Sequence, residues 1–365
     1  MSTRVLLFQL LFLATGMLST LGAQWVKYRG AANALSFVTS LCQFIGMILV
    51  AALPPTKTYT DHQPDPSSLH PNLSCLAPFL SYLRVYGPAN IRGAAFISIL
   101  EVAGNLILVA GMFLTGSGLF MVIYSSIVVF TALFSRMLLP GRSLSRVQWA
   151  SVISICFGLS LTAVGNTGNE NAAASHLILL GTLVCIFGTA VLSLVYVATD
   201  HILTEGSSTP YSQCIWVGIF SSLLTLVAML FLSIPSLRTL PLFDSDVVAA
   251  HLILILSSLG HSVAYFELVE STGGIATGVL QGLRAVGVFG LSHVWFCERD
   301  EGQCFTVWKG AATVIVVCGV VAFAAAKGMQ EKGAGKGEYG GSLGAIPLPT
   351  DDFYDEDDDI PLGRF

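Results

Sequence analysis

The stretch from Val5 to Ala23, VLLFQLLFLATGMLSTLGA, contains no charged residue and has the length of a membrane-crossing helix. A hydrocarbon layer of ~30 Å is crossed by about 20 helical residues. Residues 31–53 and 214–234 form two more uncharged runs of similar length. Because lipid offers no hydrogen-bond partner to the backbone, we expect each of these runs to be a transmembrane helix.

The composition of the whole chain agrees with this interpretation. Of the 365 residues, 54% are hydrophobic and only 11% are charged, and the mean hydropathy is +0.75. A soluble domain carries about 25% charged residues, because its surface faces water. The net charge of −5 comes largely from acidic residues between positions 351 and 359, and no basic stripe indicates a nucleic-acid partner. The sequence therefore predicts an integral membrane protein whose partners are membrane lipid and a small-molecule solute.

The apolar segments predict an all-α membrane protein with ten transmembrane helices. The shortest break between two of them falls at Gly116-Ser117-Gly118. A proline-rich loop is expected at 54–92, and a disordered acidic tail is expected after Lys327. The ten segments cover approximately residues 5–23, 31–53, 93–114, 117–138, 147–165, 173–199, 212–234, 248–270, 273–296 and 305–326.

The two halves of the chain share landmarks. Thr115-Gly116-Ser117-Gly118 precedes the fourth segment, and Thr272-Gly273-Gly274 precedes the ninth. We therefore expect one five-helix repeat at 1–165, a second at 166–327 and the tail at 328–365. Five is an odd number, so the repeats must be inverted relative to each other, as in many secondary transporters.

Lysine and arginine are expected to concentrate on the cytosolic side of the membrane. With ten helices both termini share one side, and that side holds eleven basic residues against five on the other. We therefore expect both termini, and the loop at 54–92, in the cytosol. The first side carries Arg4, Lys57, Arg84, Arg92, Arg136, Arg142, Arg146, Lys327, Lys332, Lys336 and Arg364, and the second carries Lys27, Arg29, Arg238, Arg299 and Lys309.

Several motifs resemble a known family. Thr131–Ser135, with Leu144-Ser145 and Gln148–Ser151, is similar to helices four and five of solute carrier family 35, the nucleotide-sugar transporters and their relatives in the drug/metabolite transporter superfamily. Leu280–Val286 and Leu18–Trp25 resemble helices nine and one of the F branch of that family. The resemblance covers about residues 5–326. It implies ten helices, alternating access and residence in an endomembrane such as the Golgi, an endosome or a lysosome or vacuole.

The chain departs from that family at two positions that concern the substrate. The resemblance implies lysines in helices four and nine that meet nucleotide phosphates, but the matching positions here are Ile127 and Gln281. Neither side chain pairs with a phosphate. The favoured function is therefore a secondary transporter of another small organic solute, by exchange or proton coupling. A nucleotide-sugar or organophosphate antiporter is the first alternative, and a non-transporting scaffold or receptor is the second.

Ionisable and polar residues inside the apolar segments are the candidates for substrate binding or gating. A charge in a membrane span costs a few kcal/mol at least, so it usually faces a cavity or a partner. Arg284 is the strongest candidate, and an internal ion pair with Glu101 is its structural alternative. His261 either carries a coupling proton or simply bonds a neighbouring helix. The complete set is Arg284, Gln281, Tyr124, Ser125, Glu101, Asn105 and His261.

The remaining motifs add little. No Walker sequence and no HExxH motif is present, so the sequence predicts no enzyme, no cofactor and no metal site. Cys297 and Cys304 flank a polar turn and either form a disulfide in an oxidising lumen or stay unpaired. A homodimer stays an alternative for the oligomeric state.

Overall fold

The computed structural model describes residues 3–33, 36–54, 86–124, 126–139, 144–164, 172–237, 240–299 and 303–338. These residues contain helices and no strand, which confirms the all-α prediction. The elements are α1 (Thr3–Tyr28), α2 (Val38–Ile48) with the 3₁₀ turn η1 (Leu49–Ala52), α4 (Ile91–Tyr124), α5 (Ile127–Leu138), α6 (Arg146–Val164), α7 (Ala172–Thr204), α8 (Pro210–Leu232), α9 (Ile234–Leu237), α10 (Ser245–Thr272), α11 (Gly274–Phe296) and α12 (Val307–Glu338).

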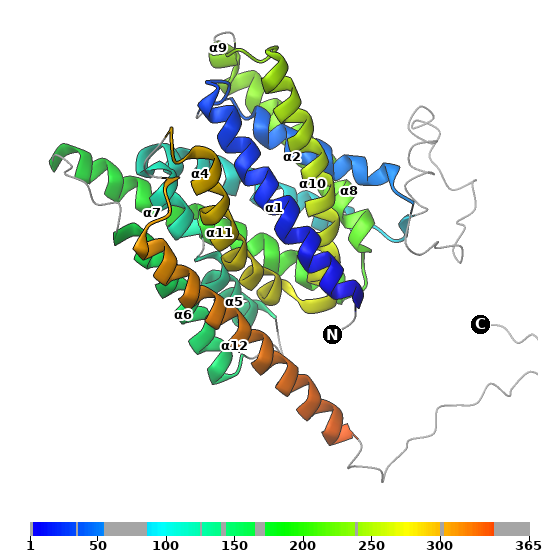
Figure 1. The fold of residues 1–365 in the computed structure, drawn as a ribbon. Helices are drawn as coiled ribbons and strands as arrows, with labels where there is room; N and C mark the ends of the chain where they lie inside the picture. The colour runs from blue at the N-terminus through cyan, green and yellow to red at the C-terminus, as the bar shows by residue number, and fades with distance from the viewer. Residues whose placement is uncertain are drawn as a thin grey trace, which may run out of the picture.

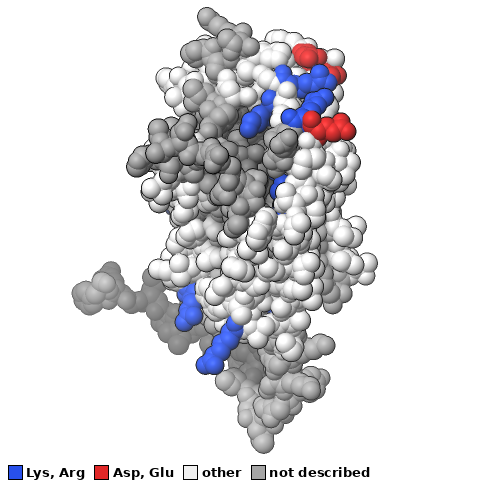
Figure 2. Space-filling model, turned by 60° about the vertical axis from the view of Figure 1, so that its left-hand side comes forward, with Lys and Arg blue, Asp and Glu red and all other residues white. Residues whose placement is uncertain are grey.

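Among the described residues, seven helices are long and apolar enough to cross a membrane, in α1, α4, α7, α8, α10, α11 and α12. Their outer faces expose large apolar side chains, of which Leu7, Leu230 and Phe231 are more than half exposed. On the face shown in Figure 2, the charged side chains of the described residues lie mainly toward the two ends, and a broad region with few charges separates them. Such an apolar belt needs lipid around it, so the chain is a multi-pass membrane protein.

Polar side chains cap several of the helices. Ser145 and Gln148 form a reciprocal capping box at the start of α6, with the Ser145 N–H donating to Gln148 Oε1 at 2.8 Å. Thr209 and Asp244 cap α8 and α10 in a similar way. Gly273 separates α10 from α11 with a positive φ of 84°, a conformation that favours glycine. The helices α10 and α11 therefore divide where the sequence predicts the break between the eighth and ninth segments.

The break predicted at Gly116-Ser117-Gly118 is wrong. The α4 helix continues through these residues to Tyr124, and the chain turns at Ser126 before α5 begins. A glycine inside a helix costs only about 1 kcal/mol. In lipid an interrupted helix leaves backbone groups without partners, which costs more.

The last helix is also longer than the sequence predicts. We expect a disordered tail after Lys327, but α12 continues to Glu338. Lys327 itself donates a hydrogen bond from Nζ to the Thr272 carbonyl at the end of α10. The acidic residues 351–359 lie outside the described part of the chain, as does most of the loop at 54–92.

The helices pack mainly in pairs that are distant in sequence. The closest pairs are α4 with α7, α6 with α12, α1 with α10, and α2 with both α10 and α8. Figure 1 shows α1 running beside α10 over most of its length. Ion pairs join these two helices near both ends, Arg4 with Glu267 at 2.9 Å and Arg29 with Asp246 at the opposite end. The pair α1–α10 is therefore antiparallel and fastened at each end.

The turn after α11 contains the bonded pair Cys297–Cys304, so the disulfide alternative is the one that the structure adopts. Lys309 Nζ donates to the Cys304 carbonyl at 2.8 Å and fixes the turn against α12. His293 lies close to both sulfur atoms. Because a disulfide removes the thiolates that bind metals, these three residues are not a metal site in this state.

Candidate functional site

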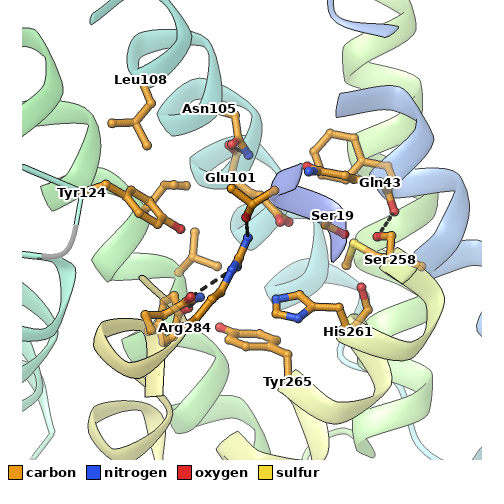
Figure 3. Close-up of a pocket in the computed structure, with 18 of the residues that line it drawn as sticks. Ser19, Gln43, Glu101, Asn105, Leu108, Tyr124, Ser258, His261, Tyr265 and Arg284 are labelled. Carbon is orange, nitrogen blue, oxygen red and sulfur yellow. Dashed lines mark hydrogen bonds between the residues drawn. The ribbon is translucent and has the colours of Figure 1, made fainter. Parts of the chain in front are cut away.

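A cavity of about 310 Å³ lies between α1, α2, α4, α7, α10 and α11. Three of these helices come from the first half of the chain and three from the second. Most of the cavity wall is apolar, and polar side chains project into it from several sides (Figure 3). Pockets that hold drug-sized ligands range from about 300 to 1,000 Å³, so this cavity suits a small solute.

The cavity collects almost all of the site residues that the sequence predicts. Ser125 lies outside the described residues. The others come from three helices, α4, α10 and α11, and Tyr124 is the last residue of α4. The cavity is lined by Arg284, Gln281, Tyr124, Glu101, Asn105 and His261.

A chain of hydrogen bonds positions the guanidinium of Arg284. Its Nη2 donates to the Thr20 hydroxyl on α1 at 2.5 Å, and its Nη1 donates to Gln281 Oε1 at 3.2 Å. The amide of Gln281 in turn donates to the Tyr196 hydroxyl at 2.7 Å. All three of these partners are neutral. The guanidinium is therefore fixed in direction, while its positive charge is not compensated by these contacts.

Arg284 and Glu101 do not form the ion pair that the structural alternative requires. Within the described part of the chain, no carboxylate lies within 4.0 Å of the Arg284 guanidinium. Glu101 projects from α4 into the same cavity (Figure 3). Its Oε2 atom is buried and forms no hydrogen bond of good geometry with the described groups, although the Ser221 hydroxyl of α8 lies near the carboxyl group. The cavity therefore contains a guanidinium and a carboxyl group that do not form an ion pair with each other.

Asn105 and His261 make local contacts that restrict their roles. The Asn105 amide donates to the Glu101 carbonyl of its own helix at 2.9 Å. His261 Nδ1 lies 3.1 Å from the Phe12 carbonyl, and the ring stacks on Phe12 at 4.4 Å. Because a carbonyl only accepts, Nδ1 must carry the hydrogen. His261 thus bonds a neighbouring helix, and the same ring still faces the cavity.

Sequence reasoning did not find Gly16, Thr20 and Tyr196. Thr20 and Tyr196 hold the chain of hydrogen bonds around Arg284, and Gly16 lies one helical turn before Thr20 on the same face of α1. An alanine Cβ at Gly16 would lie 2.9 Å from Arg284 Cδ and 3.0 Å from His261 Cε1. Small and hydroxyl residues are ordinary in membrane helices, so only the contacts distinguish these three.

Replacing Gly16 by alanine is expected to displace Arg284 and to raise the apparent KM for a transported solute by about tenfold. The added methyl overpacks the site by about 1–3 kcal/mol, and a shift of the guanidinium is one way to relieve the clash. Gly22→Ala on the same helix is the matched control, because its Cβ meets only the flexible end of Leu254 at 3.1 Å, away from the cavity. Equal KM values for the two variants would contradict the prediction.

The comparisons with known proteins show a similar fold and give no activity. No family model matches this chain. Uncharacterized protein C12G12.12 of Schizosaccharomyces pombe is 24% identical over 136 residues, which cover 37% of this chain and 41% of the yeast protein. The chain thus matches less than half of that relative. A solved crystal structure, whose description names no activity, is similar with a TM-score of 0.61 at 16% identity over 88% of this chain and 96% of the other. This likeness concerns the fold alone.

Proposed function

We propose that this chain is a secondary carrier that moves a small organic solute across an endomembrane by alternating access. The observation that carries the proposal is the Arg284 guanidinium, which neutral partners hold at the wall of the cavity. A charge inside a membrane protein is costly and usually serves a ligand, an ion or a partner. Since no described carboxylate pairs with it, a solute group is the best remaining partner.

The helix pairing supports an arrangement of ten spans as two inverted repeats. The main helix–helix contacts are preserved when each helix is replaced by its counterpart in the other half of the chain. The counterparts are α1 and α7, α2 and α8, α4 and α10, α5 and α11, and α6 and α12. The pair α1–α10 becomes α7–α4, α2–α10 becomes α8–α4, and α1–α11 becomes α7–α5, all of which are in contact. The pairs α2–α8, α5–α11 and α6–α12 become themselves. Such a pattern is expected of repeats with a substrate site between them.

The disulfide supports the proposed orientation. Disulfides persist in oxidising compartments and are rare in the cytosol. The bonded pair Cys297–Cys304 follows the C-terminal end of α11, and this end faces away from the cytosol if both termini are cytosolic. The proposal therefore places the turn between these cysteines in the lumen of an organelle such as the Golgi, an endosome or a lysosome.

Nucleotide-sugar antiport is less well supported by the cavity. Most nucleotide sugars carry two phosphates and a large base, whereas the cavity is small and, among the described residues, Arg284 is the only lysine or arginine that lines it. The positions where the family resemblance implies lysine hold Ile127 and Gln281, and Gln281 is already bonded to Arg284 and Tyr196. A scaffold or receptor role has no observation in its favour, because it gives the costly Arg284 charge no use.

The carrier function predicts counterflow in liposomes. Purified protein, reconstituted with a high internal concentration of an unlabelled solute, is expected to accumulate the same labelled solute from outside without ATP. The panel should contain amino acids, organic cations, organic phosphates and nucleotide sugars, and protein-free liposomes are the control. If no member of the panel accumulates above that control while the protein is folded and correctly inserted, the carrier function is contradicted.

A further inference from the structure

The guanidinium of Arg284 and the carboxyl group of Glu101 reach the cavity from different halves of the chain. Arg284 comes from α11 and Glu101 from α4, and both line the same cavity. A guanidinium has five N–H donors, and Arg284 uses one on Thr20 and one on Gln281. Donors therefore remain for a carboxylate, which guanidinium groups bind with two parallel hydrogen bonds.

Glu101 offers the complementary feature. Its carboxyl group lines the cavity, its buried Oε2 atom forms no hydrogen bond of good geometry, and the neighbouring Ser221 hydroxyl of α8 is a neutral donor that leaves the negative charge without a counter-charge. No lysine or arginine of the described residues lies within 4.0 Å of this carboxyl group. A donor on the solute is therefore the natural partner, and a protonated amine brings both the hydrogen and the opposite charge.

The rest of the wall fits an apolar body between these two groups. Tyr124, Tyr196 and Tyr265 line the cavity together with Phe44 and Phe266, and the wall is mainly apolar. Tyrosine rings also attract a nearby ammonium group through their faces. A solute with only an anionic group would leave Glu101 without a partner, and one with only a cationic group would leave Arg284 without one.

We infer that the solute is a small zwitterion of the amino-acid type, with its carboxylate on Arg284, its ammonium on Glu101 and an apolar side chain among the tyrosines. This inference deepens the proposed function and rests on it only for the claim that the bound solute is transported. Binding itself requires no transport. The cavity volume of about 310 Å³, at the low end for ligand pockets, agrees with a solute of this size.

Thermal stabilisation of the purified full-length chain tests the inference, because a ligand that binds only the folded form raises Tm. The probes are the twenty common amino acids, and then the methyl ester and the deaminated acid of each one that binds. At least one amino acid with an apolar side chain is expected to raise Tm. Its ester, which lacks the carboxylate, and its deaminated acid, which lacks the ammonium, are expected to bind at least about tenfold more weakly.

The variant Glu101→Gln gives a second measurement that depends on the same pairing. It is expected to weaken amino-acid binding by about tenfold and to leave the affinity for the deaminated acid unchanged or improved. Either of two results would overturn the inference: no amino acid raises Tm, or the ester or deaminated acid binds the wild-type protein as well as its parent. If amino acids bind but no counterflow occurs, the carrier function fails and the inference stands. If another solute class shows counterflow and no amino acid binds, the carrier function stands and the inference is overturned.

Discussion

Replacing Arg284 by alanine is expected to lower the apparent affinity for an anionic or zwitterionic solute by about 30-fold to 3,000-fold. Removing one member of a buried, hydrogen-bonded charge pair costs about 2–5 kcal/mol, and each 1.4 kcal/mol is a factor of about ten. The loss also leaves the Thr20 hydroxyl and the Gln281 carbonyl without the donors that they now accept from. Initial rates of counterflow over a range of solute concentrations measure the effect.

Two further variants separate a specific role from general damage. Arg284→Lys keeps the charge but has three donors on one nitrogen, too few for Thr20, Gln281 and both oxygens of a carboxylate, so only partial recovery is expected. Arg299→Ala removes an exposed arginine from the turn after α11 and is expected to leave the kinetics unchanged. If Arg284→Ala transports an acidic solute with wild-type kinetics, Arg284 does not bind the solute, and the alternative of a structural arginine returns.

The sequence alone was sufficient to predict those site residues whose type is unusual for their surroundings. Arg284 and Glu101 are ionisable residues inside apolar runs, and that costly placement alone marks them. Whether these two side chains form an ion pair could not be predicted, because the same sequence is compatible with a pair and with two separate groups. The distinction depends on side-chain directions that Thr20 and Gln281 fix, and these come from the packing of α1 against α11.

The boundaries of the helices show a similar limit. The glycines at 116 and 118 predict a break when they are considered locally, whereas the helix continues through them to Tyr124. Gly273 predicts a break equally well, and there the chain does turn, with a positive φ. What differs is the surroundings: Asp200 accepts a hydrogen bond from the Gly274 N–H at 3.2 Å and so satisfies the backbone at the start of α11. Such a partner is distant in sequence.

Replacing Gly46 by leucine is expected to have the largest effect on folding. Gly46 allows α2 to approach the backbone of α10, since a Cβ there would lie 2.6 Å from the Ile255 carbonyl oxygen and 2.9 Å from the Leu259 nitrogen. Backbone atoms cannot rotate away as a side chain can, so the two helices must separate. Separation also breaks the bond from the Ser258 hydroxyl to the Gln43 carbonyl at 2.7 Å. A loss of about 3 kcal/mol or more is expected.

Fluorescence-detected size-exclusion chromatography and Tm measure this loss, which should appear as little monodisperse protein and a lower Tm. The matched control is Gly290→Leu on α11, because Gly290 is exposed and its Cβ would meet no atom within 4 Å. Leucine is also a better helix former than glycine, so that variant should be as stable as the wild type or slightly more so.

Because α2 supplies Gln43, Phe44 and Met47 to the cavity wall, any Gly46→Leu protein that does fold should bind solute poorly. Equal stability of the two leucine variants would mean that α2 and α10 do not pack by backbone contact. The contribution of α2 to the cavity wall, which depends on this packing, would then be contradicted as well.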